Sequence, residues 1–428
     1  MKQLASLLSS LPRFTLTGPP NPTLTALTAD SRRVRPGSLF VAYRGVQVDG
    51  HRFLPDALAR GAVAVVVEGE TPIAVPETVT LLRVPDGREA LAHLAAAWYD
   101  HPSRRMTLAG ITGTDGKTTT TNLCYHILRR AGRKVGMVST VNAVIGDEVL
   151  ETGLHTTTPN ALDVQRYLAQ MADAGTEICL LEVTSHGLAH HRVTGCDFDY
   201  ALVTNITHEH LDLHGSREAY RRAKARLFQM ARRAAILNAD DESFPFLQSH
   251  IDPALPRLTY GIEQPAGLRA TGITSQPDAT RFRVALGGRS RAVQTPLAGA
   301  FNVSNVLAAL ALTVEMLGVD AEVALDALRD FPGVPGRMER VDAGQPFTAI
   351  VDFAHTPNAL RRALETVRAL TGGRVIAIFG CAGRRDVEKR AMMGRVAAEL
   401  ADITILTAED PRTEDLEAII AATARAMR

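Results

Sequence analysis

The feature that most constrains the fold is residues 107–132, TLAGITGTDGKTTTTNLCYHILRRAG, where an apolar strand runs through a glycine-rich turn into a helix. In that order the N–H groups of the turn and the positive end of the helix dipole face one point, which makes an anion site. Lys117 adds a mobile charge and Thr118 a hydroxyl suited to Mg²⁺. Ile111 replaces the first glycine of the strict G-x-x-x-x-G-K-[ST] pattern, so a tight turn with a solvated lysine is the alternative. The strand-to-helix context favours phosphate binding.

Later apolar runs predict a parallel sheet around this loop. They are ICLLEVTS (178–185), DYALVTNI (199–206) and AAILNADD (234–241), with helical stretches between them. Continuous apolar strands that alternate with helices are typical of a parallel sheet covered on both faces. Such sheets bind ligands at the carboxyl ends of their strands. The polar residues that end these runs are therefore candidate site residues.

Shifts in pattern predict three α/β domains. Residues 1–103 form a small N-terminal domain with strands at 39–45 and 62–69. Residues 104–333 form a central parallel-sheet domain with the phosphate loop. A stretch rich in proline and glycine then leads into a Rossmann-like domain, 334–428. We expect this last domain to be incomplete, because the chain ends inside a helical segment.

The composition is that of a soluble globular protein. Of 428 residues, 46% are hydrophobic and 22% charged, and no apolar run approaches the roughly 20 residues of a membrane span. The N-terminus lacks the features of a leader peptide. Four cysteines stand singly, which indicates reduced thiols. Because 47 basic residues balance 46 acidic ones, we expect no nucleic acid or membrane partner. The reduced thiols favour a cytoplasmic protein, and a monomer is the default expectation.

Residues that follow the predicted strands offer ligands for a divalent cation. Glu182 ends one strand, and THEHLDLHG, which contains His210, follows the next. A carboxylate and an imidazole at neighbouring strand ends, close to a phosphate loop, can hold a cation against a nucleotide. Zinc is the alternative, but the H-E-x-x-H spacing is absent.

Three further residues are ambiguous by pattern. Lys224, in the helical AYRRAKARLF, has the spacing of an ordinary surface lysine. Asp352 follows a strand and Arg337 precedes it, so both could reach a nucleotide if the domains close over it. An ordinary helix start at Thr356 is the alternative for the segment after Asp352.

Twelve motifs in order resemble the Mur ligase family, and most closely its UDP-N-acetylmuramoyl-tripeptide synthetases. The motifs are LTADSR with GSLFVAYRGVQVDGH, GITGTDGKTTTT, HTTTP, LEVTSHGLAHHR, TNITHEHLDLHG, AKARLF, LNADD, LAGAFNVSN, PGRMERV, DFAHTP, FGCAGRRDVEKR and EDPRTED. They extend along nearly the whole chain.

The resemblance implies a reaction. A ligase of this kind uses ATP to phosphorylate the D-Glu side-chain carboxylate of UDP-N-acetylmuramoyl-L-alanyl-D-glutamate, and the acyl phosphate then reacts with the amine of a diamino acid in peptidoglycan synthesis. ATP and two Mg²⁺ ions are the implied cofactors, with Lys117 neutralising charge between the two anions.

The resemblance also assigns roles by position. The implied metal-site residues are Thr118, Glu182, His210 and, once carbamylated, Lys224; Lys117, Lys224 and His210 are the implied catalytic residues. The implied ATP contacts are Gly113, Thr114, Asp115, Gly116, Lys117, Thr118, Thr119, Asn302, Arg337 and Asp352. The implied contacts of the UDP-muramoyl peptide are Ser31, Val46, Gln47, Val48, Thr157, Thr158, Thr184, His190 and Arg192. The implied amino-acid contacts are Arg390, Glu409, Asp410, Pro411 and Arg412.

The sequence departs from the family pattern in three respects. His190 and Thr184 stand where glutamine and serine are frequent. The amino-acid-selecting motif, often DNPR for meso-diaminopimelate, reads EDPR here, and an acidic Asp410 would favour L-lysine or L-ornithine, while Arg412 keeps diaminopimelate open. The final strand and GxGHE-type loop of the family are expected to be missing.

Three other functions are weighed against the ligase. A truncated ligase-like protein would bind nucleotide and precursor without turnover. A folylpolyglutamate synthase would lack the uridine-binding DSR and DGH elements of the first domain. A phosphate-loop kinase would leave Glu182, His210 and Lys224 without a common purpose.

Overall fold

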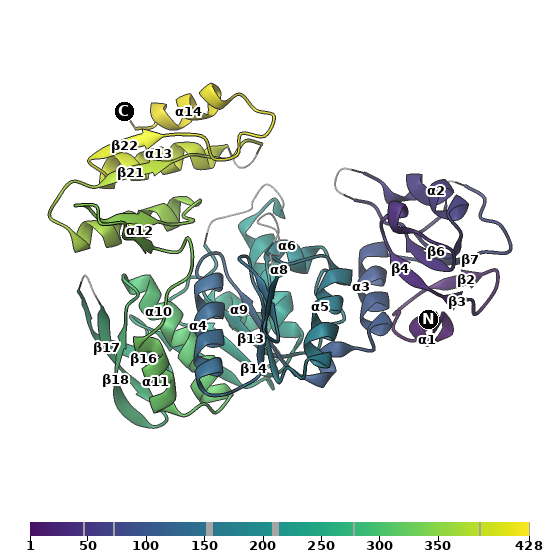
Figure 1. The fold of residues 1–428 in the computed structure, drawn as a ribbon, viewed down its shortest axis with the longest axis horizontal. Coiled ribbons are helices and arrows are strands. Elements are labelled where there is room, and N and C mark those ends of the chain that lie inside the picture. Colours follow the sequence, from purple (N-terminus) through teal and green to yellow (C-terminus); the bar gives the residue numbers. More distant parts are fainter. Residues whose placement is uncertain are drawn as a thin grey trace. The chain divides into compact units, whose positions relative to one another are not determined.

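The computed structural model describes residues 1–45, 48–71, 73–150, 157–207, 214–276, 279–384 and 387–427 (Figure 1). The chain divides into two compact units. The first unit contains Met1–Leu108, Gly136–Cys179 and Val183–Asp199, and the second contains Ala109–Val135, Leu180–Glu182 and Tyr200–Arg428.

A five-stranded sheet forms the N-terminal part of the first unit. Its order is β2 (Thr15–Thr17), β7 (Thr80–Val84), β6 (Ala62–Glu68), β5 (Ser38–Val41) and β4 (Ala26–Thr28), with only β2 antiparallel to its neighbour. Helices α1 (Ala5–Leu8) and α3 (Gly87–Trp98) contribute to the core on one face, and α2 (Leu54–Ala59) to the core on the other. The strands predicted at 39–45 and 62–69 are confirmed as β5 and β6.

The rest of the first unit consists of short strands and helices. Strands β9 (Val135–Val138), β10 (Ala143–Ile145) and β11 (Glu148–Leu150) pair in antiparallel fashion. Helix α5 (Ala161–Asp173) packs against α3, and α6 (Ser185–Ala189) follows β12 (Ile178–Glu182). Strands β1 (Lys2–Gln3) and β3 (Thr23–Leu24) form a separate pair.

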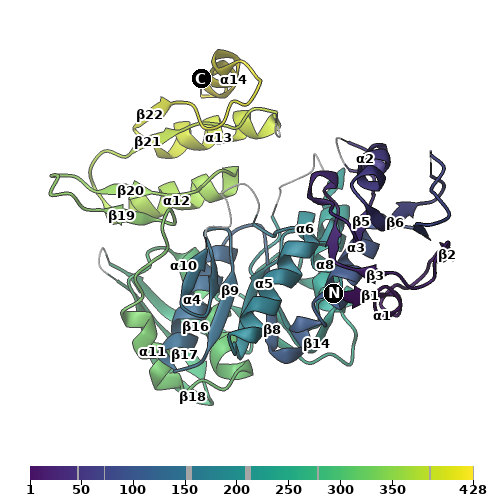
Figure 2. The same cartoon turned by 45° about the vertical axis from the view of Figure 1, so that its right-hand side comes forward.

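The second unit contains the predicted central sheet. From Leu180–Glu182 of β12 onward its order is β12, β8 (Thr107–Thr112), β13 (Phe198–Val203), β14 (Ala231–Asn238), β15 (Arg257–Gly261), β16 (Leu268–Ser275), β17 (Thr280–Leu286) and β18 (Arg289–Thr295). Strand β8 pairs in parallel with β13, and β15 pairs in parallel with β14 and β16, whereas β16 to β18 are antiparallel. Helix α4 (Lys117–Arg130) packs against α10 (Ala300–Leu310) and α11 (Ala321–Arg329), as Figure 2 also shows. The α/β class with a mostly parallel central sheet is confirmed.

The C-terminal part of the second unit is a smaller α/β layer. Its elements are β19 (Glu339–Val341), β20 (Ala349–Val351), α12 (Pro357–Leu370), β21 (Ile376–Phe379), α13 (Glu388–Leu400), β22 (Ile403–Leu406) and α14 (Leu416–Arg425). Strands β21 and β22 pair in parallel. Residues of α12, α13 and α14 form a core with Ala377 of β21, while Ile376, Ile378, Ile403 and Ile405 of the two strands are exposed.

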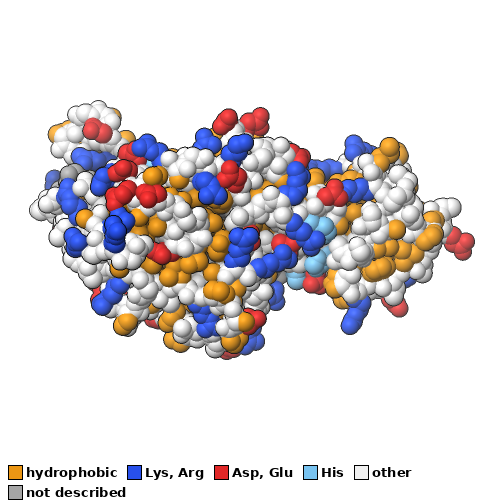
Figure 3. Space-filling view, turned by 90° about the horizontal axis from the view of Figure 1, so that it is seen from below, with side chains coloured by type: hydrophobic (Ala, Val, Ile, Leu, Met, Phe, Trp, Pro, Cys, Tyr) orange, Lys and Arg blue, Asp and Glu red, His pale blue; other side chains and the backbone are white. Residues whose placement is uncertain are grey.

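The surface charges and the state of the cysteines are as the composition predicted. Basic and acidic side chains are interspersed on the face in Figure 3. All four cysteines are buried and unpaired, and burial raises the pKa of Cys196 to about 12. Within the part of the chain that the structure describes, no helix is long and apolar enough to cross a membrane.

Candidate active site

The phosphate loop lies between β8 and α4 and needs glycine for steric reasons. Gly116 has a φ of +81°, and a Cβ there would lie 2.3 Å from Asn305 Oδ1. The loop is held from the next strand, because Thr114 N donates to Asn205 O at 2.8 Å and Asp115 N donates to Asn205 Oδ1 at 3.0 Å. The conformation of the turn is therefore fixed by contacts within the protein.

Lys117 places its charge over this loop. Its Nζ donates to Gly113 O at 2.9 Å and to Thr114 O at 2.8 Å. A phosphate bound at the N-terminus of α4 would find both the ammonium group and the helix dipole at hand.

Thr118 lies beside a buried carboxylate. Its Oγ1 donates to Glu182 Oε2 at 3.1 Å, and Glu182 is fully buried at the end of β12. Arg337 Nη2 donates to Thr118 Oγ1 at 3.3 Å. A hydroxyl and a carboxylate are the hard oxygen ligands that Mg²⁺ prefers, so the donor set fits this ion.

One predicted metal ligand cannot be placed. His210 lies outside the described residues. Within the described ranges, no three His, Cys, Asp or Glu side chains cluster at metal-binding distance.

Lys224 is buried, so the expectation from spacing that it is a surface lysine is wrong. It is 1% exposed, and its Nζ donates to Gly113 O at 2.7 Å. Helix α8 (Arg217–Gln229) turns Tyr220, Lys224, Leu227 and Phe228 toward the interior, because residues three and four apart share a helix face. The lysine Nζ lies 4.9 Å from the centre of the Tyr220 ring.

Two residues that the sequence did not single out, Tyr220 and Asn305, also lie against the phosphate loop. The Tyr220 hydroxyl is 2.9 Å from Thr114 Oγ1. Asn305 Nδ2 donates to Asn302 Oδ1 at 3.0 Å, and Thr120 Oγ1 donates to Asn305 Oδ1 at 3.4 Å. Position alone could have pointed to both, since Tyr220 lies one turn before Lys224 and Asn305 one turn after Asn302.

The C-terminal segment of the second unit contacts the phosphate loop. Asn358 Nδ2 donates to Asp115 Oδ2 at 3.2 Å. Asp352 accepts from Met338 N at 2.6 Å, and desolvation raises the pKa of its carboxyl group. The Arg337 guanidinium lies 4.7 Å from the centre of the Phe353 ring. The structure thus brings Arg337 to Thr118 and Asp352 close to Arg337.

Several predicted precursor contacts lie together in the first unit. Thr158 Oγ1 is 3.0 Å from Thr184 Oγ1, and Arg192 Nη1 donates to Thr158 O at 2.7 Å. Thr157 Oγ1 accepts from Thr140 at 3.1 Å. Arg88 Nη1 donates to His190 Nδ1.

The predicted uridine contacts are placed only in part. Ser31 is buried at the start of a 3₁₀ turn, and Val48 is exposed. Val46 and Gln47 lie outside the described residues.

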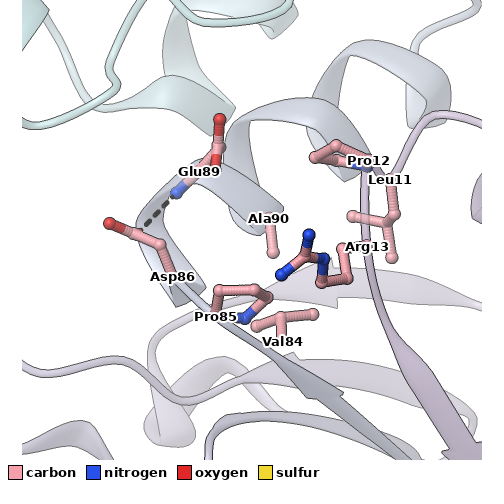
Figure 4. A pocket seen from close by; sticks show the side chains of 8 residues that line it. All are labelled: Leu11, Pro12, Arg13, Val84, Pro85, Asp86, Glu89 and Ala90. Carbon is pink, nitrogen blue, oxygen red and sulfur yellow. Dashed lines mark hydrogen bonds between the residues drawn. The ribbon is translucent and has the colours of Figure 1, made fainter.

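A separate pocket of the first unit contains none of the predicted site residues. It is lined by Leu11, Pro12, Arg13, Val84, Pro85, Asp86, Glu89 and Ala90 (Figure 4). Its Asp86 carboxylate caps α3 by accepting from Arg88 N at 2.8 Å and from Glu89 N at 3.0 Å. This carboxylate therefore has a structural role.

Of the predicted amino-acid contacts, Glu409, Asp410, Pro411 and Arg412 lie on the loop after β22, which neighbours the loop after β21, and Arg390 lies on α13. The loops touch where Gly383 N donates to Asp410 O at 2.8 Å, and a Cβ on Gly383 would lie 2.0 Å from Pro411 O. Arg412 Nε donates to Asp410 Oδ2 at 3.3 Å. Glu409 is exposed beside them.

Arg390 forms an ion pair with a carboxylate of the protein. It is 3% exposed, and its Nη1 and Nη2 donate to the two oxygens of Glu414 at 2.6 and 2.8 Å. These bonds lower the pKa of Glu414 to about 2. An amino acid that reaches Arg390 therefore meets a guanidinium already partly neutralised.

Comparison with known protein families covers most of the chain. Residues 23–99 match the Mur ligase family catalytic domain, residues 111–313 the Mur ligase middle domain, and residues 336–428 the Mur ligase glutamate ligase domain. The UDP-N-acetylmuramyl-tripeptide synthetase of Roseiflexus sp. (strain RS-1) is 46% identical over 422 residues, which cover 94% of this chain and 82% of that protein. The UDP-N-acetylmuramoyl-L-alanyl-D-glutamate--2,6-diaminopimelate ligase of Geobacillus kaustophilus (strain HTA426) is 44% identical, with 98% of this chain and 85% of that protein covered.

Solved structures agree with this relationship. A UDP-N-acetylmuramoyl-L-alanyl-D-glutamate--2,6-diaminopimelate ligase superposes with a TM-score of 0.71 at 32% identity, over 94% of this chain and 81% of that one. The MurF ligase of Thermotoga maritima in complex with ADP shares the fold, with a TM-score of 0.61 at 20% identity over 94% of this chain and 97% of that one. Together with the phosphate loop, these matches show that the chain belongs to the Mur ligases, the ATP-dependent ligases of peptidoglycan synthesis.

Proposed function

We propose that this chain joins a diamino acid to the D-Glu side-chain carboxylate of UDP-N-acetylmuramoyl-L-alanyl-D-glutamate at the expense of ATP. The observation that carries the proposal is the arrangement around one loop, where Lys117, the Thr118–Glu182 pair and the buried Lys224 all converge. These groups suit phosphoryl transfer between two anions, which requires charge neutralisation and exclusion of water.

In the first step the γ-carboxylate oxygen attacks the γ-phosphorus of ATP, and the bond from that phosphorus to ADP breaks. Lys117 stabilises the charge on the transferred phosphoryl group. Mg²⁺, held by Thr118, Glu182 and His210 in this proposal, would supply further charge neutralisation at the phosphate oxygens. Asn302, Arg337 and Asp352 would hold the nucleotide, and the contact of Asn358 with Asp115 supports a C-terminal segment that shields it.

In the second step the amine attacks the acyl carbon and phosphate leaves. We infer that Lys224 acts here as a carbamate. Its free amine would add to carbon dioxide, forming an N–C bond and releasing a proton, and the resulting anion could serve as ligand for a second Mg²⁺. The position suits this role, because the Lys224 Nζ is buried directly beside Gly113 of the phosphate loop.

The precursor would be held by the first-unit set Ser31, Val46, Gln47, Val48, Thr157, Thr158, Thr184, His190 and Arg192. Thr184 accepts from Gly187 N at 3.0 Å as the cap of α6, so its hydroxyl is fixed in position. Because the precursor is linked to UDP and ATP is consumed, we place the reaction in the cytoplasm, and we propose a monomer.

The loops after β21 and β22 would select the amine. Asp410 accepts from Arg412 and so weakens the attraction of Arg412 for a distal carboxylate. This favours L-lysine or L-ornithine. The Geobacillus kaustophilus relative is named for 2,6-diaminopimelate. Arg412 could bind the distal carboxylate of that amino acid, so diaminopimelate is tested as well.

The test is phosphate release from ATP with the UDP-muramoyl dipeptide and, in parallel, L-lysine, L-ornithine or meso-diaminopimelate. Release that depends on one amine supports the ligase and names its substrate, and Lys117→Ala should abolish it. Preference for diaminopimelate over both diamines would contradict the role given to Asp410. Nucleotide binding without release with any amine would contradict the ligase activity.

A further inference from the structure

Arg88 holds an unusual position in the first unit. It lies in the first turn of α3, where the helix dipole disfavours a positive charge. Its Nη2 donates to Arg44 O at 3.1 Å, its Nη1 donates to His190 Nδ1, and its guanidinium lies 5.5 Å from the centre of the Tyr43 ring. These contacts fix the guanidinium in place without neutralising it.

A second guanidinium lies close by. Arg192 follows His190, the contact of Arg88, by two residues and is half-buried. Burial lowers its pKa, Tyr43 raises it, and the charge of Arg88 lowers it by a smaller amount. In the described part of the chain, no carboxylate lies within ion-pair distance of either arginine. Two like charges held near each other on a partly shielded surface cost free energy that an anionic ligand would offset.

Arg166 of the same unit shows what a solely structural arginine looks like. It also stacks on a tyrosine, with 4.9 Å between its Cζ and the centre of the Tyr167 ring. Unlike Arg88, it has its own counterion, because Nη2 donates to Asp163 Oδ1 at 2.8 Å.

We propose that Arg88, together with Arg192, binds the diphosphate of the UDP-linked precursor. The proposal rests on the function proposed above and adds a binding residue to it. Guanidinium groups bind phosphate oxygens through paired, charge-assisted hydrogen bonds.

Arg88 lies between the candidate uridine contacts and the candidate muramoyl-peptide contacts, and this position favours the diphosphate as its ligand. On one side it bonds to the carbonyl of Arg44, two residues before the candidate uridine contact Val46. On the other side it bonds to His190, a candidate muramoyl-peptide contact. In the substrate the diphosphate links uridine covalently to the muramoyl sugar. A cation between the uridine contacts and the muramoyl-peptide contacts would therefore lie next to the diphosphate.

The experiment compares binding of UDP, uridine and the UDP-muramoyl dipeptide to the wild-type protein, Arg88→Gln and the matched control Arg166→Gln. Loss of charge-assisted hydrogen bonds should weaken UDP and the dipeptide by about 10- to 100-fold in Arg88→Gln. Uridine should bind as to the wild type, and Arg166→Gln should bind all three normally. Arg88→Lys keeps the charge but not the forked geometry, so it should lose UDP affinity by several-fold.

Three outcomes would overturn the inference. Unchanged UDP affinity in Arg88→Gln would remove Arg88 from the site. Weakening of the dipeptide but not of UDP would assign Arg88 to a peptide carboxylate, and equal weakening of uridine would mean that it only shapes the loop after Tyr43. A different result would contradict the proposed function itself: a wild-type protein that binds UDP but releases no phosphate from ATP.

Discussion

Gly116 is the residue at which the phosphate loop has least freedom. It combines a left-handed φ of +81° with the 2.3 Å approach that a Cβ would make to Asn305 Oδ1. Both the backbone and the helix α10 behind it therefore exclude a side chain.

Gly116→Ala should weaken ATP binding by at least about 10-fold, because the loop must move away from Asn305 and lose its anion-binding shape. Nucleotide titration measures this loss. The control is Gly132→Ala after the end of the same helix α4, where φ is +73° and no atom lies within 4 Å of the added Cβ. Normal ATP affinity in Gly116→Ala would show that the loop adapts.

Lys224→Met should abolish most phosphate release, by about 100-fold or more, because it removes a buried polar group beside Gly113 while keeping a side chain of similar length. ATP binding should persist, since Lys117 and the loop remain. Steady-state kinetics and nucleotide titration separate these effects. Arg222→Met on the solvent side of α8, where Arg222 is 64% exposed, should be fully active, and an active Lys224→Met would exclude a catalytic role.

The sequence predicted the phosphate loop more readily than the environment of Lys224. A turn with glycine and lysine between a strand and a helix predicts phosphate binding from the order of its residues. A single lysine in a basic helix gives no sign in the sequence of whether its side chain is buried. The neighbours Tyr220 and Leu227 on the same helix face were the available signal. Val46, Gln47 and His210, which lie outside the described residues, stay predictions from resemblance.

At the scale of elements, β21 and β22 and the loops that follow them form the candidate amino-acid site. Gly383 permits the close contact of these loops, and Arg384 and Arg412 both adopt left-handed φ values, of 49° and 54°. Such conformations cost free energy in non-glycine residues and concentrate at functional sites. The Arg390–Glu414 pair ties α13 to the loop before α14.

This pair should make the C-terminal layer sensitive to acid. The pKa of Glu414 is about 2 in the folded chain against 4.5 as its ordinary value, so its stabilising contribution is complete above pH 4.5 and is lost as the pH falls from 4.5 to about 2. Glu414→Gln should therefore be less stable than the wild type near neutral pH, with a difference that shrinks in acid. Denaturant unfolding at several pH values measures it, with Glu417→Gln as control. A difference independent of pH would contradict the ion pair.

Element prediction succeeded where apolar runs are continuous. β8, β12, β13 and residues 234–238 of β14 are buried on both faces, so these sequences are almost uninterrupted apolar runs. The antiparallel strands β16 to β18 were not predicted, because only alternate residues are buried and polar side chains break each run. A search for alternation with a period of two would have found them.

At the scale of the whole molecule, the chain has a nearly neutral surface of mixed charges, with a formal net charge of +1 (Figure 3). Recognition of highly charged substrates must therefore come from local groups. Lys117 in the second unit and the Arg88–Arg192 pair in the first are such groups.

Mg²⁺ with a non-hydrolysable ATP analogue should raise the thermal midpoint by a few degrees, because a ligand at 100 times its Kd stabilises the folded state by about 2.7 kcal/mol. Lys117→Ala should lose most of this shift while melting normally without ligand. Thermal melts with and without the analogue measure both. A full shift in Lys117→Ala would place the nucleotide elsewhere.

The burial of all four thiols has a practical consequence for studying this ligase in motion. Cys124, Cys179, Cys196 and Cys381 are shielded, and burial raises the pKa of each, so none presents a reactive thiolate at neutral pH. A cysteine introduced on the surface would therefore be the preferred target for a maleimide dye without removal of the native ones. With one dye on α2 and another on α13, single-molecule fluorescence could follow how the distance between them changes as each substrate binds.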